Sequence, residues 1–313
     1  MKSIYKSAEG ERAVRERYLQ FLKYWPVPNQ QLRVPTREGE TFVIACGGEQ
    51  APPVLLLHGA MANSSMWMGD VAAWSAHFRI YAVDVIGEPG LSAPSRPPLA
   101  SESHALWLDD VMDGLSLERA SMVGISLGGW LALDYATRRP RRVDRVAVLC
   151  PGGVGGQNIG TALKVACLAL FGEWGKRKAR EMILGRAPSD PPPAVKALLD
   201  FMRLIAGNFR PRMVKLPVFS NDALKRLTMP VLAILGARDV LLDSAGTSRR
   251  LEQNVPHAEI RWLPDVGHLI VGQTRPILEF LNRPAIIGGS PPDERHHAIE
   301  EADGAREGRG LSV

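Results

Sequence analysis

The 313-residue chain has only three cysteines, Cys46, Cys150 and Cys167, and they form no motif. An odd number of scattered cysteines provides no disulfide framework and suits a reducing compartment, so we expect each to be a small apolar filler. The chain also lacks a run of about 20 apolar residues, which a membrane-spanning helix needs. Residues 1–6 are not followed by an apolar signal segment. We therefore expect a cytoplasmic protein without membrane partners.

Other absences limit the possible ligands. The sequence contains no internal repeat, no glycine-rich phosphate loop and no Cys/His cluster with metal-ligand spacing, so we predict neither a cofactor nor a metal. The net charge is +5, with basic runs at residues 138–142 and 176–178. No aromatic residues are interleaved with these runs for base stacking. We therefore predict no nucleic-acid partner.

The most informative segment that is present is residues 124–129, with the sequence Gly-Ile-Ser-Leu-Gly-Gly. It follows the apolar residues 120–123 and precedes a helix-like segment from Trp130. In a tight turn from strand to helix, glycines around Ser126 remove side chains that would collide. Such a turn lifts the serine hydroxyl to the sheet edge and points the helix N-terminus at a developing oxyanion. This pattern makes Ser126 a candidate nucleophile.

A serine hydroxyl needs a base to activate it, and the base needs an acid to orient it. Among the seven histidines, His268 lies in a loop that follows the strand-like residues 259–263. A loop at the carboxyl end of a strand suits a mobile general base. We expect activity to rise as His268 loses its proton, at about pH 6 to 7.

The candidate acid is Asp239, which comes directly after a buried strand and a short turn. Its carboxylate can accept a hydrogen bond from Nδ1 of His268 and fix the tautomer of that ring. Asp243 is the alternative, although its position suits the N-cap of the helix expected over residues 244–251. The chain order Ser126, Asp239, His268 differs from the orders of chymotrypsin and subtilisin.

An acyl-transfer site also needs two backbone donors for the oxyanion. We expect one to be the N–H of Leu127, directly after the serine. The other is expected from the loop after residues 54–57, where Gly59 allows a sharp turn and the N–H of Ala60 can face the serine. We expect His58 to brace this loop by hydrogen bonds and not to serve as a second base.

Together these motifs resemble the α/β-hydrolase superfamily over about residues 31–283. The matching segments occur in the order of that superfamily: residues 58–60, 84–92, 124–129, 236–239 and 266–268. Residues 25–28 and 34–39 further resemble a bacterial carboxylesterase-like subgroup. The resemblance implies an α/β fold with a mostly parallel sheet, helices on both faces and an inserted helical lid. It also implies structural roles for Asp84 and Gly90 in loop geometry.

The expected function is hydrolysis of a small-molecule carboxylic ester, lactone or thioester by a serine hydrolase through an acyl-enzyme. Ser126 argues against epoxide hydrolases and haloalkane dehalogenases, which resemble this fold but carry aspartate there. Two alternatives stay open. One is an acyltransferase, a cyclase or a carbon–carbon hydrolase with the same three residues, although residues 60–64 lack the Gly-Pro-Gly run usual in carbon–carbon hydrolases. The other is a non-enzymatic protein that binds a small ligand.

The alternation of apolar strands and helices, with one helix beginning at Met66, predicts a parallel sheet covered on both faces. We divide the chain into five parts: an N-terminal amphipathic helix and arm (1–27), a first core part (28–152), a helical lid (153–226), a second core part (227–284) and a disordered tail (285–313). The lid is expected to contain helices over residues 158–171, 174–184 and 193–206. The glycines of residues 152–156 form either its hinge or a simple loop. Four apolar residues are candidates for the substrate pocket: Met61, Met66, Trp67 and Trp130. The sequence does not indicate an oligomeric state.

Overall fold

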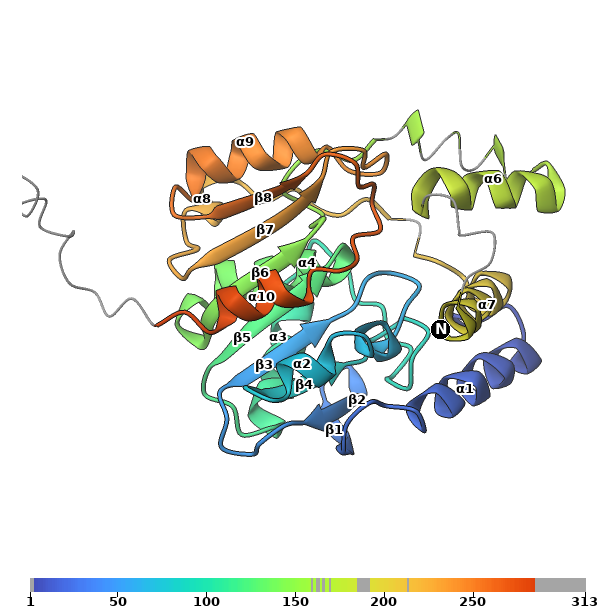
Figure 1. Ribbon diagram of the computed structural model, residues 1–313, viewed down its shortest axis with the longest axis horizontal. Helices are drawn as coiled ribbons and strands as arrows, with labels where there is room; N and C mark the ends of the chain where they lie inside the picture. The colour runs from blue at the N-terminus through green and yellow to red at the C-terminus, as the bar shows by residue number, and fades with distance from the viewer. Residues whose placement is uncertain are drawn as a thin grey trace, which may run out of the picture. The chain divides into compact units, whose positions relative to one another are not determined.

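One mixed β-sheet organises the protein. The computed structural model describes residues 3–284 without 159, 162, 163, 165, 166, 169, 185–191 and 213. The strands are β1 (Asn29–Thr36), β2 (Gly39–Cys46), β3 (Pro53–Leu57), β4 (Arg79–Val83), β5 (Ala120–Ile125), β6 (Val143–Leu149), β7 (Val231–Gly236) and β8 (Glu259–Leu263). Their order in the sheet is β1-β2-β4-β3-β5-β6-β7-β8 (Figure 1). Strand β2 pairs antiparallel with β1 and β4, and the pairs from β4 to β8 are parallel. The predicted mostly parallel sheet is therefore confirmed.

The register of β3 and β5 prepares the site. These neighbouring strands run parallel, with Leu57 opposite Gly124. Both strands are almost entirely buried, as expected for apolar strands that are covered on both faces. Because the carboxyl ends of parallel strands share one sheet edge, the loops that begin at His58 and Ser126 lie side by side. Ligands of open α/β sheets bind at this edge.

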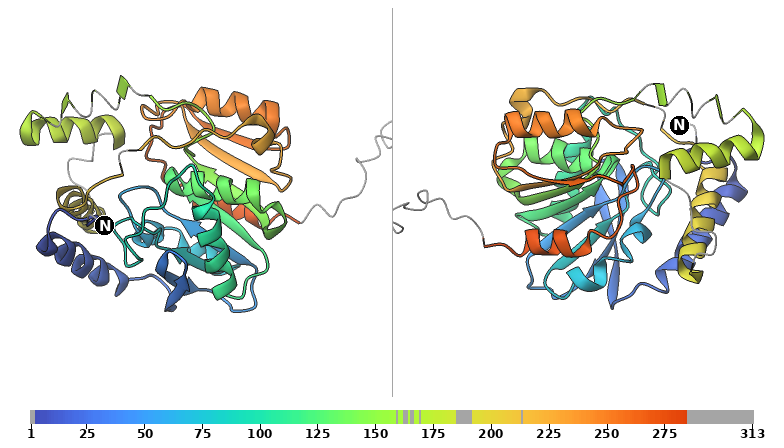
Figure 2. Two further views of the ribbon diagram at one scale, coloured as in Figure 1. Left: turned by 180° about the vertical axis from the view of Figure 1, so that it is seen from behind. Right: turned by 45° about the horizontal axis from the view of Figure 1, so that its top comes forward.

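Helices cover both faces of the sheet. The helical elements are α1 (Ala8–Leu22), η1 (Ser64–Trp67), α2 (Val71–Trp74), α3 (Ser103–Gly114), α4 (Leu127–Arg138), η2 (Pro140–Arg142), α6 (Gly172–Leu184), α7 (Pro193–Asn208), α8 (Asn221–Leu224), α9 (Ser244–Asn254) and α10 (Thr274–Leu281). One apolar core contains residues of α3, α4, α8 and α9, and a second contains residues of α2 and α10 (Figure 2). None of the described helices is both long and apolar enough to cross a lipid bilayer.

The N-terminal helix packs on the region predicted to be a lid. Helix α1 lies beside α7 (Figure 1), where the rings of Phe21 and Phe201 stack with centroids 5.0 Å apart. Tyr18 stacks on the same phenylalanine, and its hydroxyl donates to Asp84 over 2.8 Å. The apolar stripe of α1 therefore joins α7 to the loop after β4. Residues 1–281 form one compact unit, and the five-part division of the chain stays a prediction.

One expected helix differs in the structure. The helix expected from Met66 is replaced by η1 and the short α2, with Gly69 between them. Hydrogen bonds from the N–H and hydroxyl of Ser64 to Asp84 hold the start of this segment against the loop after β4. Six residues of the helix expected over residues 158–171 lie outside the described residues, so this helix stays a prediction. The expected tail, residues 285–313, lies outside them entirely.

The glycines of residues 152–156 form a packed loop. Gly153 has a φ of +78°, and a side chain there would collide with the indole of Trp130. A side chain on Gly155 would collide with the carbonyl of Asp243, and the N–H of this glycine is bonded to the hydroxyl of Thr247 at 3.0 Å. These tight contacts favour a simple loop over a hinge.

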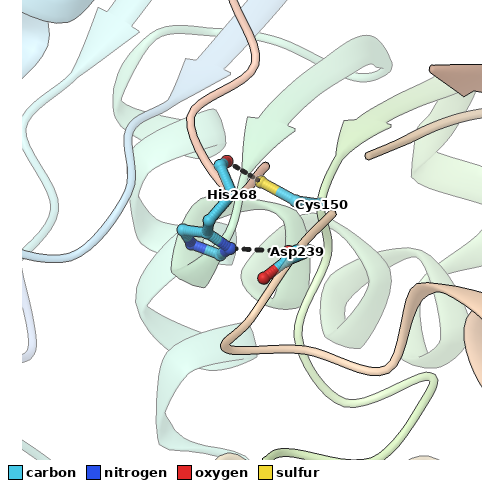
Figure 3. Close-up of side chains that lie close together, drawn as sticks. All are labelled: Cys150, Asp239 and His268. Carbon is cyan, nitrogen blue, oxygen red and sulfur yellow. Dashed lines mark hydrogen bonds and ion pairs between the residues drawn. The ribbon is translucent and has the colours of Figure 1, made fainter. Parts of the chain in front are cut away.

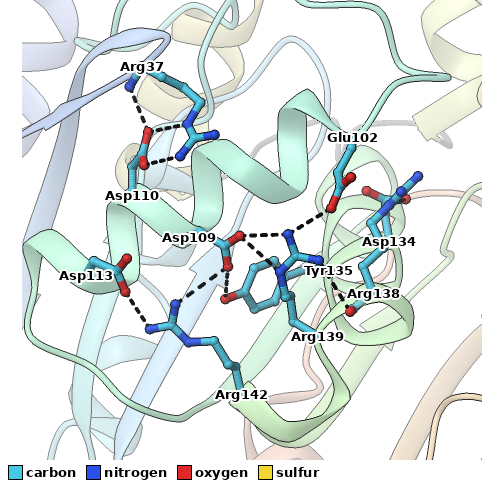
Figure 4. A network of polar contacts seen from close by, with 10 residues as sticks. All are labelled: Arg37, Glu102, Asp109, Asp110, Asp113, Asp134, Tyr135, Arg138, Arg139 and Arg142. Carbon is cyan, nitrogen blue, oxygen red and sulfur yellow. Dashed lines mark hydrogen bonds and ion pairs between the residues drawn. The ribbon is translucent and has the colours of Figure 1, made fainter.

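The basic run at residues 138–142 forms ion pairs within the molecule. Three of its arginines pair with acidic side chains on α3, on α4 and at the position before α3 (Figure 4). These pairs are Arg138 with Asp134, Arg139 with Glu102 and Asp109, and Arg142 with Asp109 and Asp113. The run follows the C-terminus of α4, where cations are favoured by the helix dipole. These contacts give the positive charges a structural role.

Candidate active site

Ser126 occupies a strained turn between β5 and α4. Its backbone has φ +52° and ψ −109°, a conformation that non-glycine residues rarely adopt. Side chains on its neighbours would not fit: one on Gly124 would collide with the carbonyl of Gly128, and one on Gly128 with the carbonyl of Leu57. The Gly-x-Ser-x-Gly spacing thus permits the close approach of β3, β5 and α4. This strained turn directly follows the carboxyl end of β5.

The structure brings His268 and Asp239 to this serine. His268 lies in the loop after β8, and its Nε2 is 3.0 Å from Oγ of Ser126. Its Nδ1 is 2.8 Å from Oδ2 of Asp239, which follows β7 (Figure 3). In the neutral ring this geometry has Nδ1–H donating to the carboxylate while Nε2 accepts from the serine hydroxyl. This arrangement would suit a nucleophile, a general base and an orienting acid.

The two candidate acids are clearly distinguished. The side chain of Asp239 is completely buried. Its Oδ1 accepts the backbone N–H groups of Leu241 at 2.8 Å and Leu242 at 3.0 Å, so only Oδ2 faces His268. Asp243 instead caps α9, accepting the N–H of Gly246 at 2.8 Å. The alternative acid therefore has the N-cap position that its sequence context predicts.

The loop after β3 lies against the serine. A side chain on Gly59 would contact Cβ of Ser126 at 3.7 Å. His58 is completely buried, and its Nε2 accepts the N–H of Val85 at 2.9 Å. The proton of this ring is therefore on Nδ1, which donates to the carbonyl of Gly59 at 2.8 Å. His58 braces the loop, as expected.

The two predicted oxyanion donors lie in different local environments. Leu127 is the first residue of α4, so its N–H has no acceptor within the helix. Ala60 is an exposed residue directly after the braced Gly59. Their assignment as an oxyanion hole stays a prediction that this placement favours.

The surroundings of His268 alter its basicity. Burial lowers its pKa, but the hydrogen bond to the Asp239 carboxylate and the contact with Cys150 raise the pKa by a larger combined amount. The pKa of His268 is therefore raised above its ordinary value. A paired carboxylate stabilises the imidazolium, which is the form that a general base becomes during attack.

Cys150 is a neighbour of the site that no sequence motif indicates. It directly follows β6 with a φ of +36°, and its Sγ is 3.1 Å from the carbonyl oxygen of His268 (Figure 3). A ligand atom from each of Cys150, Asp239 and His268 lies within 4.8 Å of the others. Within the described residues, this spacing would suit metal ligands. However, Nδ1 of His268 and Oδ2 of Asp239 are already hydrogen-bonded to each other. The geometry favours proton transfer.

The four candidate pocket residues occupy two kinds of environment. Trp67 and Trp130 are core side chains, and Trp130 stacks on Phe219 while its Nε1 donates to the carbonyl of Pro217 at 2.9 Å. Met61 and Met66 are half-buried. The packing gives both tryptophans a structural role, and a substrate contact for any of the four stays a prediction.

This fold and this site are those of the α/β hydrolases. A family model for the alpha/beta hydrolase family matches residues 54–283, and the chain belongs to that family.

Relatives that carry names show which members of the family this chain resembles. The chain is 33% identical over 256 residues to the uncharacterized carboxylesterase nap of Bacillus subtilis (strain 168), covering 81% of this chain and 85% of that protein. It is 33% identical over 262 residues to carboxylesterase YbfK of the same organism, covering 81% and 86%. The crystal structure of carboxylesterase CesB (YbfK) from Bacillus subtilis matches with a TM-score of 0.76 at 30% identity, over 88% of this chain and 99% of that one. The protein is an α/β hydrolase that resembles bacterial carboxylesterases.

Proposed function

We propose that this protein is a serine carboxylesterase that cleaves a small-molecule ester through an acyl-enzyme. The observation that carries the proposal is the continuous hydrogen-bonded chain from Ser126 through His268 to Asp239. A serine in a strained strand-to-helix turn, with a base and a buried acid in line, is suited to acyl transfer. The likeness to carboxylesterases supports an ester as the substrate.

In the first step Oγ of Ser126 attacks the ester carbonyl while Nε2 of His268 takes the hydroxyl proton. The N–H groups of Leu127 and Ala60 hold the oxygen that becomes negative. The tetrahedral species collapses when His268 returns the proton to the leaving alcohol. In the second step the same base activates water, which attacks the acyl-enzyme and releases the acid. Asp239 stabilises the imidazolium in both steps.

Helix α6 lies close to the loop that carries the base. A side chain on Gly267 would lie 3.9 Å from the carbonyl oxygen of Ile183, near the end of α6. A helical insertion next to the base can limit the access of water and select the acyl or alcohol group. We assign this role to the predicted lid, residues 153–226.

A panel of p-nitrophenyl esters, thioesters and lactones tests the proposal. We expect the free carboxylic acid to be the main product, with turnover greatest on esters, because water resolves the acyl-enzyme. The assay is repeated with added amines and alcohols, and the products are separated by chromatography. Amides or new esters as the main products would instead establish an acyltransferase. Absence of turnover across the panel, with no labelling of Ser126 by a fluorophosphonate, would favour a ligand-binding protein.

The pH dependence of kcat/KM is expected to reflect the raised pKa of His268. The base acts in its neutral form, so activity rises with pH as the ring loses its proton. Since contacts with Asp239 and Cys150 raise this pKa, we expect the rise to continue above the roughly 6.5 of an unperturbed histidine. Initial rates measured between about pH 5 and 10 test this expectation. A profile already flat above about pH 6 would show that these contacts do not raise the pKa.

A further inference from the structure

Glu88 is a buried acid that the proposed mechanism does not use. It lies in the loop after β4 and is only 3% exposed. Its Oε2 accepts the backbone N–H of Met61 over 2.7 Å. Met61 directly follows Ala60, the residue assigned as an oxyanion donor. A buried carboxylate therefore contacts the backbone one residue away from the site where negative charge develops.

The backbone at this point requires support. Met61 has a φ of +58°, in the left-handed region, which is unfavourable for a non-glycine residue. A strained residue persists only where its surroundings fix it. The bond between Glu88 and the Met61 N–H supplies such a restraint. A hydrogen bond to a charged carboxylate is about twice as strong as one between neutral groups.

Two adjacent peptide groups are fixed in this loop. His58 holds the carbonyl of Gly59, and in a trans peptide the N–H of Ala60 points the opposite way. Glu88 holds the N–H of the next peptide, between Ala60 and Met61. Only the φ and ψ torsions of Ala60 lie between these two peptide groups. Because a hydrogen bond holds each group, the two bonds together determine where the Ala60 N–H points.

The loop that carries Glu88 is itself rigidly attached. Asp84 accepts bonds from Ser64 and from the N–H of Leu91, and the side-chain amide of Asn63 donates to the carbonyl of Pro89 at 2.9 Å. The same loop supplies the N–H that fixes the brace His58. The loop after β4 thus forms a fixed support on which Glu88 can act.

We propose that Glu88 is a positioning residue whose carboxylate, by holding the Met61 N–H, keeps the Ala60 N–H in place as an oxyanion donor. The inference rests on the proposed esterase function. It assigns a role to Glu88, which lies in the segment of residues 84–92 and has no role in the mechanism described above.

The burial of Glu88 makes this restraint sensitive to pH. Burial raises the pKa of Glu88 to about 7, against the lowering effects of the Met61 N–H and of the charges of Arg96 and Arg212. Burial and Arg212 lower the pKa of His104 to about 4, so this ring is neutral when Glu88 titrates. As the pH falls through about 7, Glu88 gains a proton and its bond to Met61 loses the assistance of charge.

Two substitutions of Glu88 and one control test the proposal with a short p-nitrophenyl ester. Glu88→Ala removes the acceptor, and we expect kcat to fall roughly 10- to 100-fold with KM nearly unchanged, because a donor is displaced and not deleted. Glu88→Gln keeps an acceptor and is expected to recover most of kcat. Asp134→Ala removes another buried acid, on α4, and kcat should stay at the parent value.

A reversible trifluoromethyl ketone adds a measure that loss of stability alone would not change. Its adduct with serine carries an oxyanion, so its Ki should rise with Glu88→Ala by about the factor by which kcat/KM falls. The ratio of kcat/KM between wild type and Glu88→Gln should increase with pH through about 7, since only the glutamate titrates there. This ratio cancels the titration of His268, which both proteins share, and it decides the question if the alanine variant does not fold.

The possible failures are distinguishable. An active wild type with unchanged kcat and Ki in a folded Glu88→Ala variant overturns the role of Glu88 and leaves the esterase proposal intact. A ratio between wild type and Glu88→Gln that does not change with pH also overturns it. A wild type that hydrolyses no ester and is not labelled at Ser126 overturns the proposed function, and this inference with it.

Discussion

Replacing Ser126 with alanine is expected to lower kcat for a short p-nitrophenyl ester by at least about 10³-fold. The substitution removes the Oγ that lies 3.0 Å from Nε2 of His268, so no acyl-enzyme can form. The oxyanion donors and the rest of the site stay in place, and KM is therefore expected to change little. Burst kinetics and covalent labelling by a fluorophosphonate provide two further measurements, and both should disappear in the variant.

Ser121→Ala is the matched control for this experiment. Ser121 is a buried serine of β5, the strand that leads into Ser126, and lies five positions before it. Its removal carries a similar packing cost without touching the hydrogen-bonded chain, so kcat should stay near the parent value once folding is verified by thermal unfolding. If Ser126→Ala kept the parent rate and was still labelled, the nucleophile would be a different residue.

The sequence predicts the fold because the constraints on the fold are local. Apolar segments such as β3 and β5 alternate with helices, and the glycines around Ser126 indicate a tight turn. The N-cap position of Asp243 is likewise encoded by its immediate neighbours. The family match confirms the predicted fold class. Expectations fail where distant contacts decide, as in the segment after Asn63, where Ser64 bonds to Asp84 and the expected helix is interrupted.

The same distinction applies to the site. Ser126, Asp239 and His268 could be selected because each lies after a strand in a recognisable order, and the structure brings their side chains together. Cys150 and Glu88 also follow strands, but nothing in their spacing indicates which groups they contact. The position of Cys150 depends on how β6 ends beside the loop of His268, and that of Glu88 on the approach of two loops 27 residues apart. Such approaches follow from the packed sheet and leave no periodicity in the chain.

Replacing Asp239 with asparagine is expected to lower kcat/KM by roughly 10³- to 10⁴-fold, although the substitution is nearly isosteric. The reason lies in the two backbone N–H groups of Leu241 and Leu242 that donate to Oδ1. In asparagine the amide oxygen must occupy that position, because an NH₂ group there would face two donors. The NH₂ group then faces Nδ1 of His268 and makes this nitrogen an acceptor. The ring proton moves to Nε2, which can no longer accept the proton of Ser126.

Asp243→Asn provides the comparison, since Asp243 is the other acid that the sequence offers. Asparagine is as good an N-cap as aspartate, so both stability and kcat/KM should remain close to the parent values. The two variants are compared by steady-state kinetics, with thermal unfolding as the check on folding. A large loss in Asp243→Asn with little change in Asp239→Asn would reverse the assignment of the acid. The expected pattern instead requires that the tautomer of His268, set by one completely buried carboxylate, controls the nucleophile.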